Sequence, residues 1–331
     1  MPVTVIRFAD CVAAPASASL LFSFDRQAMK TIALKVDVDT YRGTREGVPR
    51  LLELFQSRGV NATFLFSLGR DHTGRAIKRV FRRGFMKKVS RTSVLEHYGL
   101  MTLLYGTLLP GPDIGRRCGD ILRSTEAAGF EVGIHCWDHV RWQDGVVNAD
   151  AQWTKAELDL ASERFTEIFG HPAATHGAAG WQMNRTAYRL EQRMGWTYAS
   201  DTRGSHPFWP IAEGEPIQCV QLPTTLPTLD ELLGLDGITP ETVHNQLIQA
   251  TAHEAEYGHV FTLHAEMEGM KLLPAMERML DGWEAQGYQM VSMGELYGML
   301  DLKNLPYHAV EMGEVDGRAG LLAVQGARYP S

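Results

Sequence analysis

The sequence predicts an α/β protein built as a closed or nearly closed (β/α) barrel. Short apolar runs alternate with amphipathic stretches from residue 31 onward, which is typical of parallel βα units. Several amphipathic stretches end in glycine, the residue that most often follows a helix. Seven or eight such units in roughly 270 residues suit a barrel, and an open doubly wound sheet is the alternative.

Eight runs are predicted strands because each is short, mostly apolar and bounded by turn residues or by an amphipathic stretch. No GxGxxG or GxxxxGK[ST] motif follows any of these runs, so the usual nucleotide-binding loops are missing from the sequence. In chain order the predicted strands are Thr31–Val38, Asn61–Leu68, Glu131–Cys136, Ala173–Gly177, Thr197–Ser200, Ile217–Leu222, His259–His264 and Gln289–Met293. Amphipathic stretches predict helices at 46–60, 118–130, 151–170, 184–195, 241–258 and 272–287.

Composition excludes several classes of protein. The net charge of -7 over 331 residues gives no signal for a nucleic-acid partner. The four cysteines are widely spaced and form no CxxC pair, which argues against a disulfide framework or a cysteine zinc site and fits a reducing compartment. No run of about 18 apolar residues occurs, so the sequence predicts no membrane-spanning helix.

The chain divides into three predicted parts. Residues 1–28 fit a secretory signal poorly, because Asp10, Pro15 and several serines interrupt the apolar stretch. We interpret them as a poorly ordered N-terminal extension or an overcalled start. Residues 29–300 are the predicted barrel, and residues 301–331 are a predicted C-terminal tail.

A basic amphipathic insertion is predicted after the second strand, at about residues 70–118. It is much longer than an ordinary βα connection, and it contains no acidic residue from His72 to Leu95. Interleaved basic and apolar side chains suit an anionic membrane surface or a lipid phosphate, whereas a solvated helical hairpin is the alternative. The basic side chains predicted to make this contact are Lys78, Arg79, Arg82, Arg83, Lys87 and Lys88.

Two aspartates close the first strand. Residues two apart on a strand point to the same side, so Lys35, Asp37 and Asp39 share one face. Unpaired carboxylates are costly to bury, which predicts a partner for each of them. Either they have a functional role, or Asp39 caps the turn while Asp37 pairs with an arginine.

Two further clusters follow other strands. In "GIHCWDH", His135 and His139 are four residues apart, which on one helical turn would suit a divalent metal. In "TLHAEMEG", His264 closes a late strand. Parallel strands bring their C-terminal ends together, so these histidines are expected near the two aspartates. His176, Asp201 and Arg203 also follow strands and are candidates to bind or orient a substrate. Small residues around His176 leave room for a substrate to approach the backbone, and Asp201 is a candidate to orient a histidine.

Asp-x-Asp, H-x-x-x-H and Leu-His in this order resemble the polysaccharide deacetylase family, over about residues 31–300. The resemblance implies a distorted (β/α)7 barrel and metal-assisted hydrolysis of an acyl group on a sugar. It implies Asp39, His135 and His139 as metal ligands, Asp37 as catalytic base and His264 as general acid. One divalent ion is implied; zinc is the first expectation for mixed nitrogen and oxygen ligands, with cobalt, nickel or manganese as alternatives.

The family's Arg-x-Pro-x-Gly motif is degraded here. Gly180 matches, but His176 and Ala178 stand where arginine and proline would be. The group that orients Asp37 is therefore open, with Arg42, Arg45 and Arg203 as the candidates.

Longer segments, among them "DVDTYRGTREGVPRLLELF" and "HCWDHVRWQ", resemble one branch of this family. That branch removes the formyl group from undecaprenyl-phosphate-linked 4-deoxy-4-formamido-L-arabinose. The resemblance implies a peripheral enzyme on the cytoplasmic side of the bacterial inner membrane, which acts in lipid A modification. The amine set free adds positive charge to lipid A and so weakens the binding of cationic antimicrobial peptides.

Three other interpretations remain. One is a deacetylase of the same fold that acts on another glycan or lipid-linked sugar. Another is a zinc peptidase that uses H-x-x-D-H with Asp138 as base, for which Asp37 and Asp39 would be dispensable. The third is a lipid-phosphate binding protein without turnover.

Overall fold

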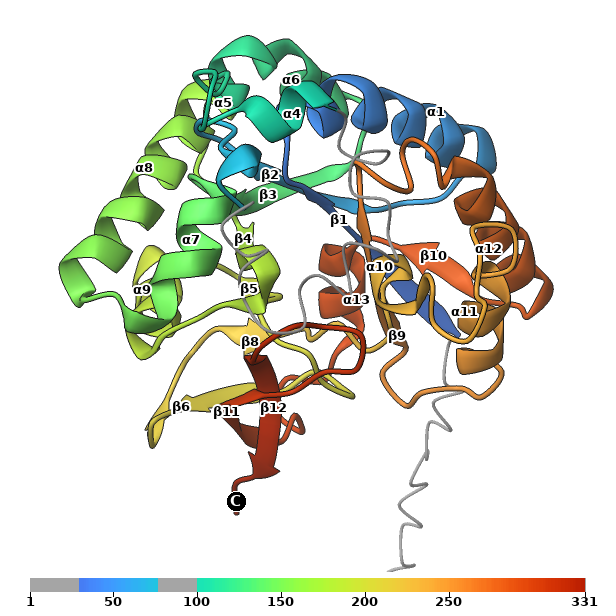
Figure 1. Cartoon of the computed structure of the whole chain (residues 1–331). Coiled ribbons are helices and arrows are strands. Elements are labelled where there is room, and N and C mark those ends of the chain that lie inside the picture. The colour runs from blue at the N-terminus through green and yellow to red at the C-terminus, as the bar shows by residue number, and fades with distance from the viewer. Residues whose placement is uncertain (1–29, 77–99, 331) are drawn as a thin grey trace, which may run out of the picture.

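Parallel strands form one curled sheet at the centre of the molecule, as the computed structural model in Figure 1 shows; it describes residues 30–76 and 100–330. Seven strands follow one another in the order β9-β1-β2-β3-β4-β5-β8, and β10 pairs with the start of β1. Their bounds are β1 Thr31–Val38, β2 Thr63–Ser67, β3 Glu131–Cys136, β4 Thr175–His176, β5 Tyr198–Ala199, β8 Val220–Gln221, β9 His259–His264 and β10 Gln289–Val291.

The ends of this sheet approach each other. No β8–β9 pairing occurs among the described residues, but the segment after β8 bonds to β9: Thr225 N–H donates to the Val260 carbonyl at 3.1 Å, and Val260 N–H donates to Thr225 Oγ1 at 2.9 Å. The sheet is therefore a nearly closed barrel, as the sequence predicted. The alternative of an open doubly wound sheet is wrong.

Helices cover the outside of the barrel because each has one apolar face (Figure 1). Asp150 and Asn184 cap the starts of α8 and α9 with their side chains, and Gly170 and Gly195 end them in the left-handed conformation, as the glycine pattern predicted. The helices are α1 Val48–Arg58, α4 Leu100–Leu104, α5 Ile114–Arg117, α6 Gly119–Ala127, α7 His139–Gly145, α8 Ala151–Phe169, α9 Arg185–Met194, α10 Leu229–Leu232, α11 His244–Ala250, α12 Leu273–Ala285 and α13 Met293–Met299, with short turns η1 Gly43–Gly47, η3 Val146–Asn148 and η4 Ala179–Trp181.

A second, smaller sheet includes most of the predicted C-terminal tail. It has the order β12-β11-β6-β7, with β6 Trp209–Ala212, β7 Glu215–Pro216, β11 Tyr307–Gly313 and β12 Leu322–Arg328. β11 pairs in parallel with β6, and β12 buries Leu322 and Ala323. Residues 301–330 are therefore structured, because strand β6, about a hundred residues earlier in the chain, provides an edge for pairing.

The predicted insertion lies only partly within the described residues. Its two ends meet, since Gly74 N–H donates to the Tyr105 carbonyl at 3.0 Å and Asp71 N–H donates to the Pro112 carbonyl at 2.9 Å. Lys78, Arg79, Arg82, Arg83, Lys87 and Lys88 lie outside the described residues, as does the extension 1–28. Within the described residues, no helix has the length and apolar character that crossing a membrane requires.

Candidate metal and catalytic centre

Three neighbouring strands place the candidate site residues at one end of the barrel. In the sheet register, Asp37 of β1 lies beside His264 of β9 and beside Leu65 of β2. The next strand, β3, carries His135 as its penultimate residue. All these strands are parallel, so their C-terminal ends open at the same edge, and the predicted polar clusters meet there.

Asp39, His135 and His139 offer ligand atoms that all lie within 4.8 Å of one another. His135 Nε2 is 3.1 Å from Asp39 Oδ1, and His139 Nε2 is 3.3 Å from Asp39 Oδ2. His135 Nδ1 donates to the Gly177 carbonyl at 2.6 Å, which leaves Nε2 as the ring's acceptor atom. Two imidazoles and one carboxylate are a donor set that fits a divalent metal.

Burial alone would raise the pKa of Asp39, but His139 and His135 outweigh that effect and hold the pKa well below its usual range. Asp39 is therefore a carboxylate at neutral pH. Its Oδ1 is buried without a hydrogen-bond donor among the described residues, which is the condition expected of an oxygen that takes a cation.

The predicted helical turn carrying both histidines is wrong in detail. His135 is the penultimate residue of β3 and His139 begins α7, with their ring centroids 5.3 Å apart. Asp138 separates the two elements because its side chain caps α7, accepting from Arg141 N–H at 3.1 Å. The other Asp138 oxygen is 2.6 Å from His72 Nδ1. With both oxygens engaged, Asp138 is not placed as the base of a peptidase.

Among the described residues, one of the two carboxylate oxygens of Asp37 is paired with a cation. Its Oδ2 lies 3.3 Å from Lys35 Nζ, and the side chains of both residues are nearly or fully buried. Its Oδ1 has no hydrogen-bond partner among the described residues and lies 3.7 Å from His135 Nδ1. One carboxylate oxygen is thus held by Lys35, and the other lies beside the candidate metal ligand His135.

His264 lies beside Asp37 and carries an unpartnered ring nitrogen. Its Nδ1 is buried without a hydrogen bond among the described residues, and its backbone N–H donates to Glu268 Oε2 at 2.8 Å. Burial raises the pKa of Glu268 to about 7. The arrangement places an imidazole and a carboxylate on adjacent strands with the metal ligands beside them.

Glu266 supports this end of β1 and was not predicted as a site residue. Its Oε1 accepts from Asp39 N–H at 2.9 Å, from Thr40 N–H at 2.6 Å and from Thr40 Oγ1 at 2.8 Å. Gly43 packs on it so closely that a Cβ there would lie 2.0 Å from Glu266 Oε1. The "HAEMEG" segment offered only a weak signal, because Glu266 lies in the turn after β9, where the alternation of a strand no longer fixes the direction of a side chain.

His176 and Asp201 form a separate buried cluster with Glu191. His176 Nδ1 is 2.9 Å from Glu191 Oε1 and 2.9 Å from Asp201 Oδ1. Burial and the nearby Asp201 raise the pKa of Glu191 well above its usual range. His176 is fully buried, so its side chain presents no surface to a substrate in this structure. Asp201 lies beside a histidine, the arrangement that an orienting role requires, and it also accepts from Ala178 N–H at 2.8 Å.

The three candidate arginines have other partners. Arg42 Nε donates to Glu46, and Arg45 donates to the Tyr41 hydroxyl. Arg203 pairs with Glu231 and donates to the Leu226 carbonyl at 3.0 Å. The residue that contacts the Asp37 carboxylate is Lys35, which the sequence placed on the same strand face without assigning it this role.

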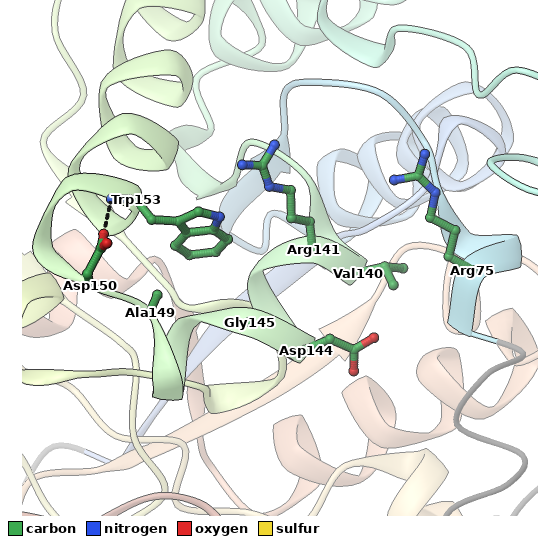
Figure 2. A pocket seen from close by; sticks show the side chains of 8 residues that line it. All are labelled: Arg75, Val140, Arg141, Asp144, Gly145, Ala149, Asp150 and Trp153. Atoms are coloured by element: carbon green, nitrogen blue, oxygen red, sulfur yellow. Dashed lines mark hydrogen bonds between the residues drawn. The ribbon is translucent and has the colours of Figure 1, made fainter.

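A pocket of about 520 Å³ lies along α7, the helix that begins with His139. Figure 2 shows the guanidinium groups of Arg75 and Arg141 on one side of it, with Asp144 and Val140 below them. Arg141 Nε also lies 3.2 Å from Oε1 of the buried Glu157. The pocket therefore offers both cationic and anionic groups close to the candidate site.

Comparisons with known proteins identify the family of this chain. The "Polysaccharide deacetylase" family model matches residues 25–199. A "Probable 4-deoxy-4-formamido-L-arabinose-phosphoundecaprenol deformylase" of Shewanella sediminis is 36% identical over 300 residues, 91% of this chain and 96% of the relative. A protein of the same name from Wigglesworthia glossinidia brevipalpis is 30% identical over 284 residues, 86% of this chain and 98% of the relative.

The crystal structure of a candidate polysaccharide deacetylase from Mycobacterium smegmatis has the same fold. Its TM-score is 0.59 at 18% sequence identity, with 92% of this chain and 99% of that chain covered. At this identity the likeness extends to the fold alone. The seven parallel strands of the expected (β/α)7 barrel are thus confirmed by the topology and by this relative.

Proposed function

We propose that this chain, which belongs to the polysaccharide deacetylase family, is a metal-dependent amide hydrolase. Its substrate is undecaprenyl-phosphate-linked 4-deoxy-4-formamido-L-arabinose, and its products are formate and the 4-amino sugar. The two relatives named for this deformylation support the substrate. The observation that carries the reaction is Asp37, whose Oδ1 has no hydrogen-bond partner among the described residues and lies 3.7 Å from Nδ1 of His135, a candidate metal ligand.

Asp39, His135 and His139 hold the metal ion in this proposal. A divalent ion held there would act as a Lewis acid: it would lower the pKa of a bound water and polarise the formyl oxygen. We take zinc as the first candidate because the donor set has two imidazoles and one carboxylate. The Gly177 carbonyl keeps His135 in the tautomer that presents Nε2 to the ion.

Asp37 and His264 move the protons. Asp37 Oδ1 accepts a proton from the water as the water oxygen attacks the formyl carbon. His264 donates a proton to the sugar nitrogen as the C–N bond breaks, because an amine leaves more readily than its anion. One water is consumed, and formate and a free amino group are formed.

The enzyme works at the cytoplasmic face of the inner membrane as a peripheral protein in this proposal. The lipid carrier of the substrate requires access to a membrane. The basic and apolar residues of the insertion suit that contact. Replacing Lys78, Arg79, Arg82, Arg83, Lys87 and Lys88 by glutamine is expected to release the protein from phosphatidylglycerol liposomes. Unchanged liposome binding would contradict a membrane role for the insertion.

The test of function measures formate released from the lipid-linked formamido sugar, with the N-acetyl analogue as the comparison substrate. We expect formate release, and faster acetate release from the analogue would favour the alternative of an N-deacetylase. Asp37→Asn is expected to lower kcat by about 10²–10⁴-fold while metal stays bound. Asp39→Asn is expected to lose the metal, as measured by elemental analysis. Full activity of a metal-free protein, or of Asp37→Asn, would contradict the mechanism.

A further inference from the structure

We propose that Lys35 is the positioning residue of Asp37 and that it fixes which oxygen of this carboxylate is free to take a proton. This inference rests on the proposed role of Asp37 as the base. In this proposal Lys35, on the same strand as Asp37, takes the role of the arginine that the family's Arg-x-Pro-x-Gly motif would provide and that this chain lacks.

Lys35 is fully buried, and its ammonium group has two partners. Nζ lies 3.3 Å from Asp37 Oδ2 and donates to the Ser200 carbonyl at 3.1 Å. A buried ammonium without an anionic partner is strongly disfavoured, so the pair is expected to stay together. The strand itself makes the contact, because residues two apart on β1 point to the same side.

Trp181 and Gly177 surround the ammonium end of the Lys35 side chain. Nζ lies 5.3 Å from the centre of the Trp181 ring, within the range of a cation–π contact. A Cβ on Gly177 would come within 2.8 Å of Lys35 Cε and 3.2 Å of Nζ, so only glycine leaves the required space. The same Gly177 accepts from His135 with its carbonyl. The chain after β4 thus holds both the lysine and a candidate metal ligand.

The consequence concerns the two oxygens of Asp37. Lys35 engages Oδ2, whereas Oδ1 has no hydrogen-bond partner among the described residues and lies on the side of His135. A carboxylate held at one oxygen presents the other in a fixed direction. Since a displacement of about 1 Å in a reacting group can lower a rate 10²-fold, this contact is expected to matter for turnover.

The first test compares Lys35→Met and Lys35→Arg with the wild type in formate release. We expect Lys35→Met to lower kcat by about 10²-fold, with KM and metal content nearly unchanged. Lys35→Arg retains a cation and is expected to recover at least part of that loss. Lys30→Met is the matched control, because Lys30 lies just before β1 and pairs with Glu254; its kcat is expected to stay at the wild-type value. Wild-type kcat in Lys35→Met would overturn the proposal, and so would loss of metal together with activity.

The second test asks whether Lys35 acts through Asp37. In an Asp37→Asn background, adding Lys35→Met is expected to lower kcat no further, because the carboxylate it positions is gone. This double variant also removes both buried charges, which protects its folding. Two losses that multiply would show an independent role and overturn the proposal.

A third measurement does not depend on the substrate. The crystal structure of Lys35→Met, or of Lys35→Arg if the first variant does not fold, gives the orientation of the Asp37 carboxylate. We expect a rotated carboxylate in Lys35→Met and a retained one in Lys35→Arg. An unmoved Asp37 in Lys35→Met, or a rotated one in Lys35→Arg, would overturn the positioning role. If the wild type releases no formate, the proposed function fails, whereas this structural result still decides the role of Lys35.

Discussion

Replacing Glu266 by alanine removes one carboxylate oxygen that accepts three hydrogen bonds where β1 meets the candidate metal ligands. The donors are the backbone N–H groups of Asp39 and Thr40 and the Thr40 hydroxyl. Both donor residues are buried, and Glu266 itself is 1% exposed. The variant therefore leaves two backbone donors and one hydroxyl without their partner.

The expected cost follows from those contacts. A buried donor that loses its acceptor costs about 1–3 kcal/mol, and water that enters the vacated space recovers part of this. For two backbone donors, we expect the free energy of unfolding to fall by about 2–5 kcal/mol. Because Asp39 is displaced with its backbone, metal affinity is expected to fall by about 10–100-fold.

Urea denaturation monitored by tryptophan fluorescence measures the stability, and titration with Zn²⁺ measures the affinity. Glu266→Gln keeps one amide oxygen as acceptor and is expected to lose less than half as much stability. Glu46→Ala is the control, since it removes an exposed carboxylate that bonds Arg42 and is expected to cost at most about 0.5 kcal/mol. A Glu266→Ala protein with wild-type stability and wild-type metal affinity would refute the reasoning.

Two further predictions concern pH and packing. Burial raises the pKa of Glu157 from 4.5 to about 7, so the folded protein keeps this carboxyl protonated where the unfolded chain ionises it. Stability is therefore expected to fall as pH rises from about 5 to 7, by up to about 3 kcal/mol. Thermal melts of Glu157→Gln should show a smaller fall, because Glu268, whose pKa is also about 7, still contributes to it. Glu163→Gln on the exposed side of α8 should keep the whole fall; equal pH curves for the two variants would contradict the prediction. Gly47→Ala places a Cβ 2.0 Å from the Ala265 carbonyl, next to His264, and is expected to cost about 1–3 kcal/mol and to lower activity. Gly298→Ala in α13 meets no atom within 4 Å and is expected to stabilise by about 0.5–1 kcal/mol; urea melts that place the two variants together would contradict this.

Long apolar strands could be predicted from the sequence with their ends. β1, β3 and β9 begin and end where their residue patterns predicted, because each is a continuous buried run that stops at polar residues. β4, β5 and β8 are shorter than predicted, since only a few residues of each run pair with neighbours. β11 and β12 were missed because their pairing depends on β6, far away in the chain.

Part of the candidate site could likewise be predicted from the sequence, and part could not. Its carboxylates and histidines could be found from their positions at strand ends. The two-residue period of a strand already put Lys35 and Asp37 on one face. The partner of Asp37 could not be chosen from the sequence, because arginines were equally available and nothing local separates them from a lysine.

By itself, the sequence determined the order of the βα units, the family and the residue types at the open end of the barrel, since periodicity and motifs are local properties. Only the tertiary structure decided that Asp138 caps a helix, that His176 is buried with Glu191 and that Lys35 holds Asp37. The physical reason is burial. For Lys35, the surroundings of the buried ammonium group depend on strands β4 and β5 and on the ring of Trp181. These lie more than a hundred residues after Lys35 in the chain.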